Sequence, residues 1–236
     1  MATTDTRDDI PVIAIDGPGG SGKGTISRRV AAGLGWHLLD SGALYRLVGL
    51  DATRQGLDLD DAESIAALAR ELDVSFDPAA EYSHIMLRGA EVTDAIRTEA
   101  SGVAASRVAA LPAVRRALVD RQRAFRERPG LVADGRDMGS VIFVDSQLKI
   151  FLTASVGERA RRRYKQLKDK GIDVSLSALS KDMSERDRRD SERAVAPLKA
   201  CPDARILDTT SMSIDEVVST VLDWAAETYR AVTGKR

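Results

Sequence analysis

The sequence predicts an α/β fold with a doubly wound, mostly parallel sheet of five strands. Apolar segments near 10–16, 36–39, 131–134, 148–152 and 205–208 have the length and the β-branched content of buried strands. Helical patterns separate these segments, as expected when each parallel strand needs a crossover connection. The first strand runs into a glycine-rich loop and then a helix, which is the setting of a phosphate-binding loop.

The loop after the first strand carries the motif that points most directly to a function. It consists of Gly17, Pro18, Gly19, Gly20, Ser21, Gly22, Lys23, Gly24 and Thr25. Glycines let backbone N–H groups surround phosphate oxygens, the following helix adds N–H donors, and Lys23 adds a positive charge. A simple glycine turn is the alternative, but the flanking strand and helix favour a nucleoside triphosphate site. The hydroxyl of Thr25 comes one residue later than in the general motif, so we do not assign Thr25 as a metal ligand.

The other elements follow from hydrophobic spacing and from residues that start helices. Helices are expected at 23–34, at 41 to about 54, from about 60 to 72, in two parts within 93–128, at 155–170, at 175–192 and in a closing segment from about 214 to 225. The segment 73–92 is typical of a small antiparallel meander, inserted between helices and outside the parallel sheet. Pro112 fits the first turn of the second helix within 93–128.

Composition limits the classes of protein to consider. The 236 residues carry a net charge of −1, which gives no general attraction to nucleic acid or to anionic membranes. The one cysteine excludes a disulfide framework and fits a reducing cytoplasm. Residues 1–9 are polar and acidic, so we expect a disordered lead-in and not a signal peptide. His37, His84 and Cys201 lack metal-ligand spacing and are interpreted as structural.

Charged residues follow the strand at 131–134. Asp134, Arg136 and Asp137 fall at its carboxyl end, where open α/β sheets bind their ligands. A phosphate-loop enzyme commonly places a carboxylate near its metal at this position. The alternative is a strand-end turn, because Asp-Gly is also a turn pair.

Two predicted helices carry further charges that could serve a site. On the helix at 155–170, Arg159 and Arg163 share a face and Arg162 lies beside it, so these arginines could neutralise a transferring phosphoryl group. A solvated helix face is an equally supported interpretation. On the helix at 175–192, the inward stripe marked by Leu176, Leu179 and Met183 continues onto Arg186 and Asp190. Charges at positions expected to be buried favour a polar ligand over a surface ion pair.

A third group lies at the start of the helix at 41–54. Ser41 alone is a good helix N-cap, and Tyr45 could be part of the packing. The guanidinium of Arg46 suits phosphate, so together the three residues indicate a ligand contact.

Four sequence motifs together resemble the bacterial cytidylate kinases. They read IDGPGGSGKGT, LLDSGALYR, ADGRDMGSVIF and ERDRRDSERAVAPL, and they run in order from residue 13 to about 198. The meander at 73–92 resembles the insertion typical of the bacterial type. The Gly-Lys-Gly-Thr ending of the family's loop accounts for the displaced hydroxyl of Thr25.

The resemblance implies transfer of the γ-phosphoryl group of ATP to CMP or dCMP, with Mg²⁺, in a monomeric cytoplasmic enzyme of pyrimidine nucleotide metabolism. Residues 10–236 would form one kinase domain, with a monophosphate-binding insertion at about 60–110 and a lid at about 155–170. ATP would bind along the loop from Gly17 to Thr25. The lid arginines would come from Arg159, Arg162 and Arg163, and Asp134 would orient the acceptor or a metal-bound water.

The resemblance also implies contacts to the acceptor nucleotide. Its phosphate would be held by Ser41, Arg46 and Arg136. Its cytosine would be contacted by Ser106, Arg115, Asp137 and Arg193. Its ribose would be contacted by Asp190 with Arg186, while Tyr45 lies beside the phosphate contacts.

Three other functions compete with this interpretation. Another small-molecule kinase, acting on uridylate, adenylate or shikimate, would differ in the base-contacting residues. A regulator that senses ATP without chemistry would need no arginine complement. A scaffold without a nucleotide would require the glycine-rich loop to be a coincidence.

Overall fold

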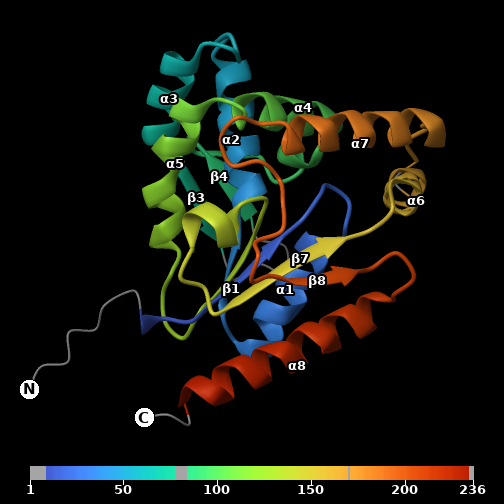
Figure 1. Cartoon of the computed structure of the whole chain (residues 1–236). Coiled ribbons are helices and arrows are strands. Elements are labelled where there is room, and N and C mark those ends of the chain that lie inside the picture. The colour runs from blue at the N-terminus through green and yellow to red at the C-terminus, as the bar shows by residue number, and fades with distance from the viewer. Residues whose placement is uncertain (1–8, 78–83, 170, 234–236) are drawn as a thin grey trace, which may run out of the picture. The chain divides into compact units, whose positions relative to one another are not determined.

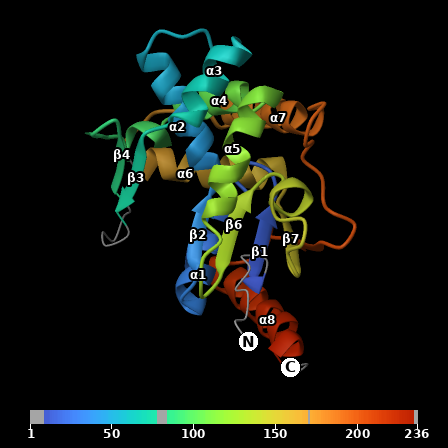
Figure 2. The same cartoon turned by 90° about the vertical axis from the view of Figure 1, so that its left-hand side faces the viewer.

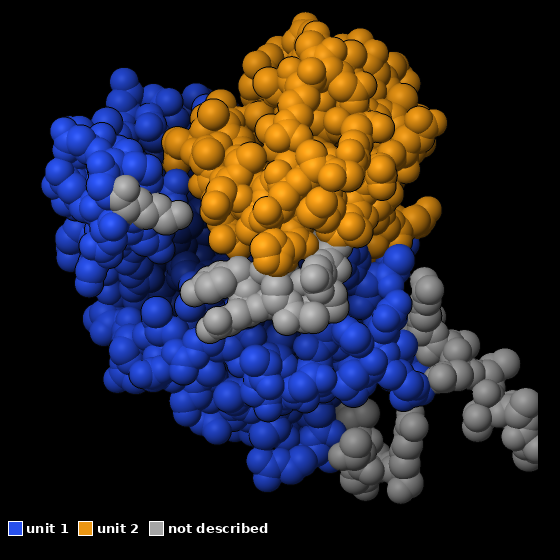
Figure 3. Space-filling model, turned by 180° about the vertical axis from the view of Figure 1, so that it is seen from behind, with its two compact units in different colours: residues 1–40, 123–236 blue, residues 41–122 orange. Residues whose placement is uncertain are grey.

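A computed structural model describes residues 9–77, 84–169 and 171–233. The chain divides into two compact units, coloured separately in Figure 3. Unit 1 comprises Met1–Asp40 and Arg123–Arg236, and unit 2 comprises Ser41–Gln122. Residues 1–8 of the expected lead-in at 1–9 lie outside the described residues.

Unit 1 is built on a five-stranded parallel sheet. Its strands are β1 (Val12–Asp16), β2 (His37–Asp40), β6 (Leu131–Gly135), β7 (Leu148–Thr153) and β8 (Arg205–Asp208). They lie in the order β2-β6-β1-β7-β8, and every pairing is parallel. Figure 2 shows β2, β6, β1 and β7 side by side. Because the chain moves from β1 to β2 on one side and later to β7 and β8 on the other, the sheet is doubly wound, as the sequence predicts.

The central strand β1 and its neighbour β6 are buried along their whole length. Every residue of β1 and of β6 is buried, in keeping with their short apolar runs. Helices α1 (Lys23–Leu34) and α8 (Ile214–Thr233) pack on each other and on the sheet (Figure 1). The core between them is apolar and includes Ile13, Ile15, Ile26, Val30, Val132, Ile150, Val217 and Val221.

A helix pair follows β7 in the chain. Helix α6 (Val156–Asp169) packs against α7 (Leu176–Ser191), and Figure 1 shows the two next to each other. The Ser175 hydroxyl accepts a hydrogen bond from the Ala178 N–H and caps α7. Leu179 and Asp190 are buried as the predicted stripe requires, but Leu176 is 42% exposed. The buried stripe therefore begins one turn later than expected.

Unit 2 contains helices and a small sheet. Its elements are α2 (Ser41–Arg54), α3 (Ala62–Arg70), β3 (Val74–Asp77), β4 (His84–Leu87), β5 (Ala90–Glu91), α4 (Glu99–Val108) and α5 (Pro112–Ala124), the last running two residues beyond the unit. The three strands pair antiparallel in the order β3-β4-β5, which confirms the predicted meander. The Asp61 carboxylate accepts from two N–H groups at the start of α3, so this helix begins slightly later than expected. Pro112 begins α5, as predicted.

Helices α2 and α4 approach each other closely at Gly49. A Cβ atom placed on this glycine would lie 2.9 Å from the Ala104 Cβ and 3.1 Å from the Ala104 carbonyl carbon. Because backbone atoms cannot move aside, the spacing of the two helices depends on the missing side chain. Across the described ranges 9–77, 84–169 and 171–233, no helix is long and apolar enough to cross a membrane.

Replacement of Gly49 by alanine should therefore destabilise unit 2. We expect a loss of about 1–3 kcal/mol in the free energy of unfolding, measured by urea denaturation, because the added methyl overpacks the contact with α4. Gly157 on α6 is exposed, and a Cβ atom placed there would meet no other atom within 4 Å, so Gly157→Ala is the matched control. That control should gain up to about 1 kcal/mol from helix propensity. Equal effects of the two substitutions would contradict the packing argument.

Candidate functional site

The register of the parallel sheet gathers acidic residues at one edge. Asp16 at the end of β1 pairs with Gly135 of β6, and Asp40 of β2 pairs with Asp134 of β6. The carboxyl ends of these strands therefore meet on the side where open α/β sheets bind ligands. Asp16 and Asp134 are both buried there.

The glycine-rich loop at residues 17–25, here called the phosphate loop, begins at this edge and leads into α1. Gly17 has φ +152°, and a Cβ atom there would lie 2.0 Å from the carbonyl oxygen of Leu152 on β7. Only glycine fits at that position. The Ser21 hydroxyl and the Lys23 ammonium both donate hydrogen bonds to the Pro18 carbonyl, at 3.0 and 2.9 Å. The loop is therefore folded around the lysine.

Lys23 and Asp134 are both buried and close enough to act on each other electrostatically. Burial lowers the pKa of Lys23, Arg136 lowers it further, and Asp134 opposes the shift. Burial raises the pKa of Asp134, and Lys23 opposes that shift. A bound polyphosphate would bring negative charge to Lys23 and favour its protonated form. A Cβ atom on Gly24 would lie 3.5 Å from Asp134 Oδ2, which places this carboxylate beside the start of α1.

Asp16 ties the strand before the phosphate loop to the segment after β6. Its two carboxylate oxygens accept hydrogen bonds from the N–H groups of Met138 and Gly139, at 2.8 and 2.9 Å. These groups begin a single helical turn over Met138–Ile142. Burial raises the pKa of Asp16 to about 6, although the two N–H groups and Lys23 oppose the shift.

The predicted arginines of α6 differ in their surroundings. Arg159 is 3% exposed, and its Nη1 donates to the Gly19 carbonyl of the phosphate loop at 3.0 Å. Arg162 donates to both oxygens of Thr209, and the Thr209 hydroxyl donates to the Ser21 carbonyl at 3.2 Å. Arg163 is partly exposed. Two of the three therefore reach the phosphate loop, directly or through one residue.

Arg161 is a fourth arginine between residues 159 and 163, and it lies on the other face of α6. Its side chain is 68% exposed and pairs with Glu158 at 2.8 Å. For this residue the structure supports the interpretation as part of a solvated helix face.

Arginines from the β6 loop and from α7 converge on the same phosphate loop. A Cβ atom on Gly19 would lie 3.5 Å from Arg136 Nη2 and 3.7 Å from Arg186 Nη1. Arg136 Nε donates to the Asp190 carboxylate at 3.1 Å. Burial opposes ionisation of Asp190, but Arg136, Arg193 and Arg186 together outweigh it and hold its pKa below the ordinary value. Asp190 is therefore a buried, charged carboxylate within an arginine cluster.

The remaining predicted contacts are divided between the units. Asp137 is buried in unit 1, and the Arg193 Nε donates to the Asp190 carbonyl at 3.2 Å. In unit 2, Arg46 Nη1 donates to the carbonyls of Ile96 and Thr98 at 2.7 and 3.1 Å.

The other unit 2 contacts lie on α2, α4 and α5. Ser41 and Tyr45 are buried on α2, and the guanidinium of Arg115 lies 5.6 Å above the Tyr45 ring. The Ser106 hydroxyl is buried on α4. Each unit thus holds its own share of the predicted residues.

Three residues near the phosphate loop were not singled out in the sequence. Asp16 ends β1, Asp187 lies between the predicted Arg186 and Asp190, and Thr209 follows β8. Polar side chains at the carboxyl ends of β1 and β8 were the available signal for Asp16 and Thr209. No local sequence signal pointed to Asp187, because its partner Arg159 is 28 residues away in the chain.

A phosphate loop on a parallel sheet, with a buried lysine and converging arginines, defines a P-loop phosphotransferase. A sequence model described as cytidylate kinase matches residues 13–227. A cytidylate kinase from Pseudomonas aeruginosa is 62% identical over 216 residues, which cover 90% of this chain and 94% of the relative. One from Aeromonas salmonicida is 55% identical over 217 residues, which cover 92% of this chain and 94% of the relative. The chain belongs to the cytidylate kinase family.

Family membership confirms the resemblance of the four motifs. It also confirms the predicted class of enzyme, a phosphotransferase acting on nucleoside monophosphates. A nucleotide substrate also follows from the family.

The shifted pKa of Asp16 predicts a pH dependence of stability. The folded-state pKa of about 6 exceeds the ordinary value of 3.8, so this carboxyl favours folding when protonated and loses that contribution as pH rises to about 6. Asparagine at position 16 does not titrate, and the cost of losing one of the two acceptors is the same at every pH. As pH rises from about 4 to about 7, wild type should lose about 2 kcal/mol of unfolding free energy that Asp16→Asn does not lose. Urea denaturation of both proteins across this range measures the difference, and a constant difference would contradict the argument.

Proposed function

We propose that this chain transfers the γ-phosphoryl group of ATP to CMP and dCMP, with Mg²⁺ as the cofactor. The observation that carries the proposal is the convergence of Lys23, Arg136, Arg159 and Arg186 on one phosphate loop, in a member of the cytidylate kinase family. Phosphoryl transfer needs little covalent help from the protein, and it depends on positioning and on neutralising negative charge. Cations around a phosphate loop supply both.

The donor nucleotide would bind along the phosphate loop. The backbone N–H groups of residues 17–25 and the start of α1 would contact the phosphate oxygens, and Lys23 would leave the Pro18 carbonyl to reach them. Arg159 and Arg162 hold α6 close to this loop through the Gly19 carbonyl and through Thr209. We expect Arg162 and Arg163 to add positive charge as the lid at 155–170 closes and excludes water.

The residues beside the loop fit a magnesium ion that is shared with phosphates. Mg²⁺ in such sites keeps several waters and binds through one or two carboxylates and the substrate phosphates. Asp134 is a buried carboxylate of β6 that lies beside the start of α1. Asp40 lies close enough to act on it electrostatically. Over the described ranges, no group of three or more His, Cys, Asp or Glu residues could hold a metal without the nucleotide. When bound, Mg²⁺ would neutralise charge on the β- and γ-phosphates.

The acceptor nucleotide would be bound by the residues that the resemblance to the family implies. Arg136, Ser41 and Arg46 would hold its phosphate, and Asp190 with Arg186 would hold the ribose. The cytosine would contact Ser106, Arg115, Asp137 and Arg193, with Tyr45 beside the phosphate contacts. Cytosine offers an amino donor where uracil offers an acceptor, so a buried carboxylate such as Asp137 can select between them.

No strong base is needed for this reaction. In-line placement of the acceptor phosphate and neutralisation by Lys23 and the arginines account for most of the expected rate enhancement. Asp134 would orient the acceptor or a metal-bound water. We place the acceptor-binding insertion at about 60–110 and expect a monomer that works in the cytoplasm.

An assay of ADP release with ATP and Mg²⁺ tests the function directly. With CMP, dCMP, UMP, AMP and shikimate as acceptors, we expect CMP and dCMP to be turned over best. Lys23→Ala should lower kcat by at least about 100-fold, because a preorganised positive charge at the transferring phosphate is lost. ATP binding without turnover of any acceptor would instead favour a nucleotide-sensing regulator. Preference for UMP, AMP or shikimate would favour another kinase.

The base-reading assignment has its own test. We expect Asp137→Ala and Arg115→Ala each to lower kcat/KM for CMP relative to UMP by about 10-fold or more, because buried partners of the cytosine are removed. Arg116 is exposed beside Arg115 on α5, so Arg116→Ala is the matched control and should keep the wild-type ratio. Unchanged ratios in both test variants would contradict the assignment.

A further inference from the structure

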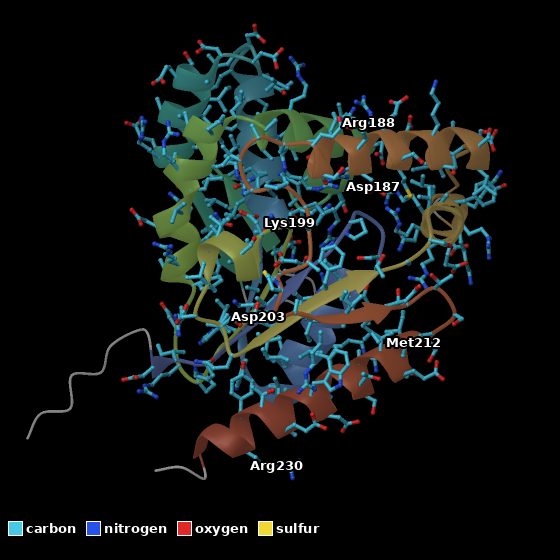
Figure 4. All side chains as sticks on the ribbon, viewed as in Figure 1. Asp187, Arg188, Lys199, Asp203, Met212 and Arg230 are labelled. Atoms are coloured by element: carbon cyan, nitrogen blue, oxygen red, sulfur yellow. The ribbon has the colours of Figure 1, made fainter. Side chains whose placement is uncertain are left out.

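Arg159 on α6 is joined to α7 by a two-pronged ion pair with Asp187. Its Nη1 and Nη2 donate to the two carboxylate oxygens at 3.1 and 2.5 Å. Figure 4 labels Asp187 on α7. The same guanidinium donates from Nη1 to the Gly19 carbonyl at 3.0 Å and from Nε to the Ala154 carbonyl at 2.9 Å. One side chain thus connects the phosphate loop, the end of β7, α6 and α7.

These contacts fix the position of the guanidinium. Four of the five N–H bonds that an arginine possesses donate to protein oxygens of the described residues, which leaves one on Nη2 for a ligand. The Arg159 side chain is 3% exposed, while the Asp187 side chain is 25% exposed. A buried guanidinium held by a fork of two hydrogen bonds has a defined orientation. Asp187 supplies both acceptors of that fork.

Asp187 lies between two residues that we assign to the acceptor nucleotide. Arg186 precedes it on α7 and approaches Gly19, and Asp190 follows it one turn later and accepts from Arg136. A shift of the phosphate loop would therefore move Arg159 and, through Asp187, the segment of α7 that carries Arg186 and Asp190. The ion pair between Lys181 and Glu185 on α7, by contrast, is exposed.

We propose that Asp187 is a positioning residue that couples the two substrate sites, so that nucleotide at the phosphate loop strengthens acceptor binding by α7. The proposal rests on the proposed function, because it takes the phosphate loop as the donor site and α7 as part of the acceptor site. Asp187 itself touches neither substrate. Its role is carried by Arg159 and by the rigid turn of α7.

Calorimetric titration of CMP, with and without a saturating non-hydrolysable ATP analogue and Mg²⁺, measures the coupling. For the wild-type enzyme we expect the analogue to tighten CMP binding about five-fold or more, and CMP to tighten analogue binding by the same factor. In Asp187→Asn each ligand alone should bind within about three-fold of wild type, while the coupling factor falls close to one, because an amide offers one acceptor and no charge.

Glu185→Gln provides the matched control on the same helix, since it also replaces a carboxylate by an amide. We expect it to keep the wild-type coupling factor. Arg159→Lys should reproduce the loss seen in Asp187→Asn, because lysine keeps the charge but lacks the fork. If Asp187→Asn does not fold, as judged by circular dichroism, Asp187→Glu replaces it, and a reduced coupling factor is again expected.

Three results would overturn the inference. The first is a wild-type coupling factor in folded Asp187→Asn. The second is tighter analogue binding and faster turnover in that variant, which would mean that Asp187 withholds Arg159 from phosphate. The third is a wild-type enzyme that phosphorylates CMP without any coupling. A wild-type enzyme that does not phosphorylate CMP would instead overturn the proposed function on which the inference rests.

Discussion

Compensation of buried positive charge organises unit 1. A site for polyphosphate needs cations that are partly removed from water, and a buried cation is stable only when a counter-charge or hydrogen-bond acceptors lie close to it. The chain meets this requirement in pairs: Lys23 lies near Asp134, Arg136 donates to Asp190, and Arg159 donates to Asp187. Each acid comes from a different element than its cation, so the pairs also hold the elements together.

The sheet and the phosphate loop could be predicted because their signals are local. The apolar run of β1 is buried on both faces, and the glycines that follow it permit one kind of loop before α1. The burial of Asp190 could also be predicted, since a helix with period 3.6 carries the apolar stripe onto that position. The same stripe was wrong at Leu176, because spacing gives the direction of a side chain but not how far the neighbouring element extends along the helix.

The partners of the charged residues could not be predicted from local patterns. Asp16 accepts from N–H groups 122 and 123 residues away, and Thr209 reaches the Ser21 carbonyl across 188 residues. Such pairs depend on the register of the sheet and on the path of the loops, which a sequence pattern does not specify. Arg159 and Arg163 illustrate this limit, because their shared helix face gave no sign that Arg159 would be buried while Arg163 is partly exposed.

The contact between Gly17 and the Leu152 carbonyl has a consequence for the unfolded chain. Glycine at this position cannot be exchanged for a residue with fewer backbone conformations, so the loop keeps a high conformational entropy when the protein is unfolded. Ordering the loop is therefore among the more costly steps in folding unit 1. Nucleotide bound at this loop, as we propose, would favour its ordered form, so the cell's own nucleotide pool would act as a stabiliser of the fold as well as a substrate.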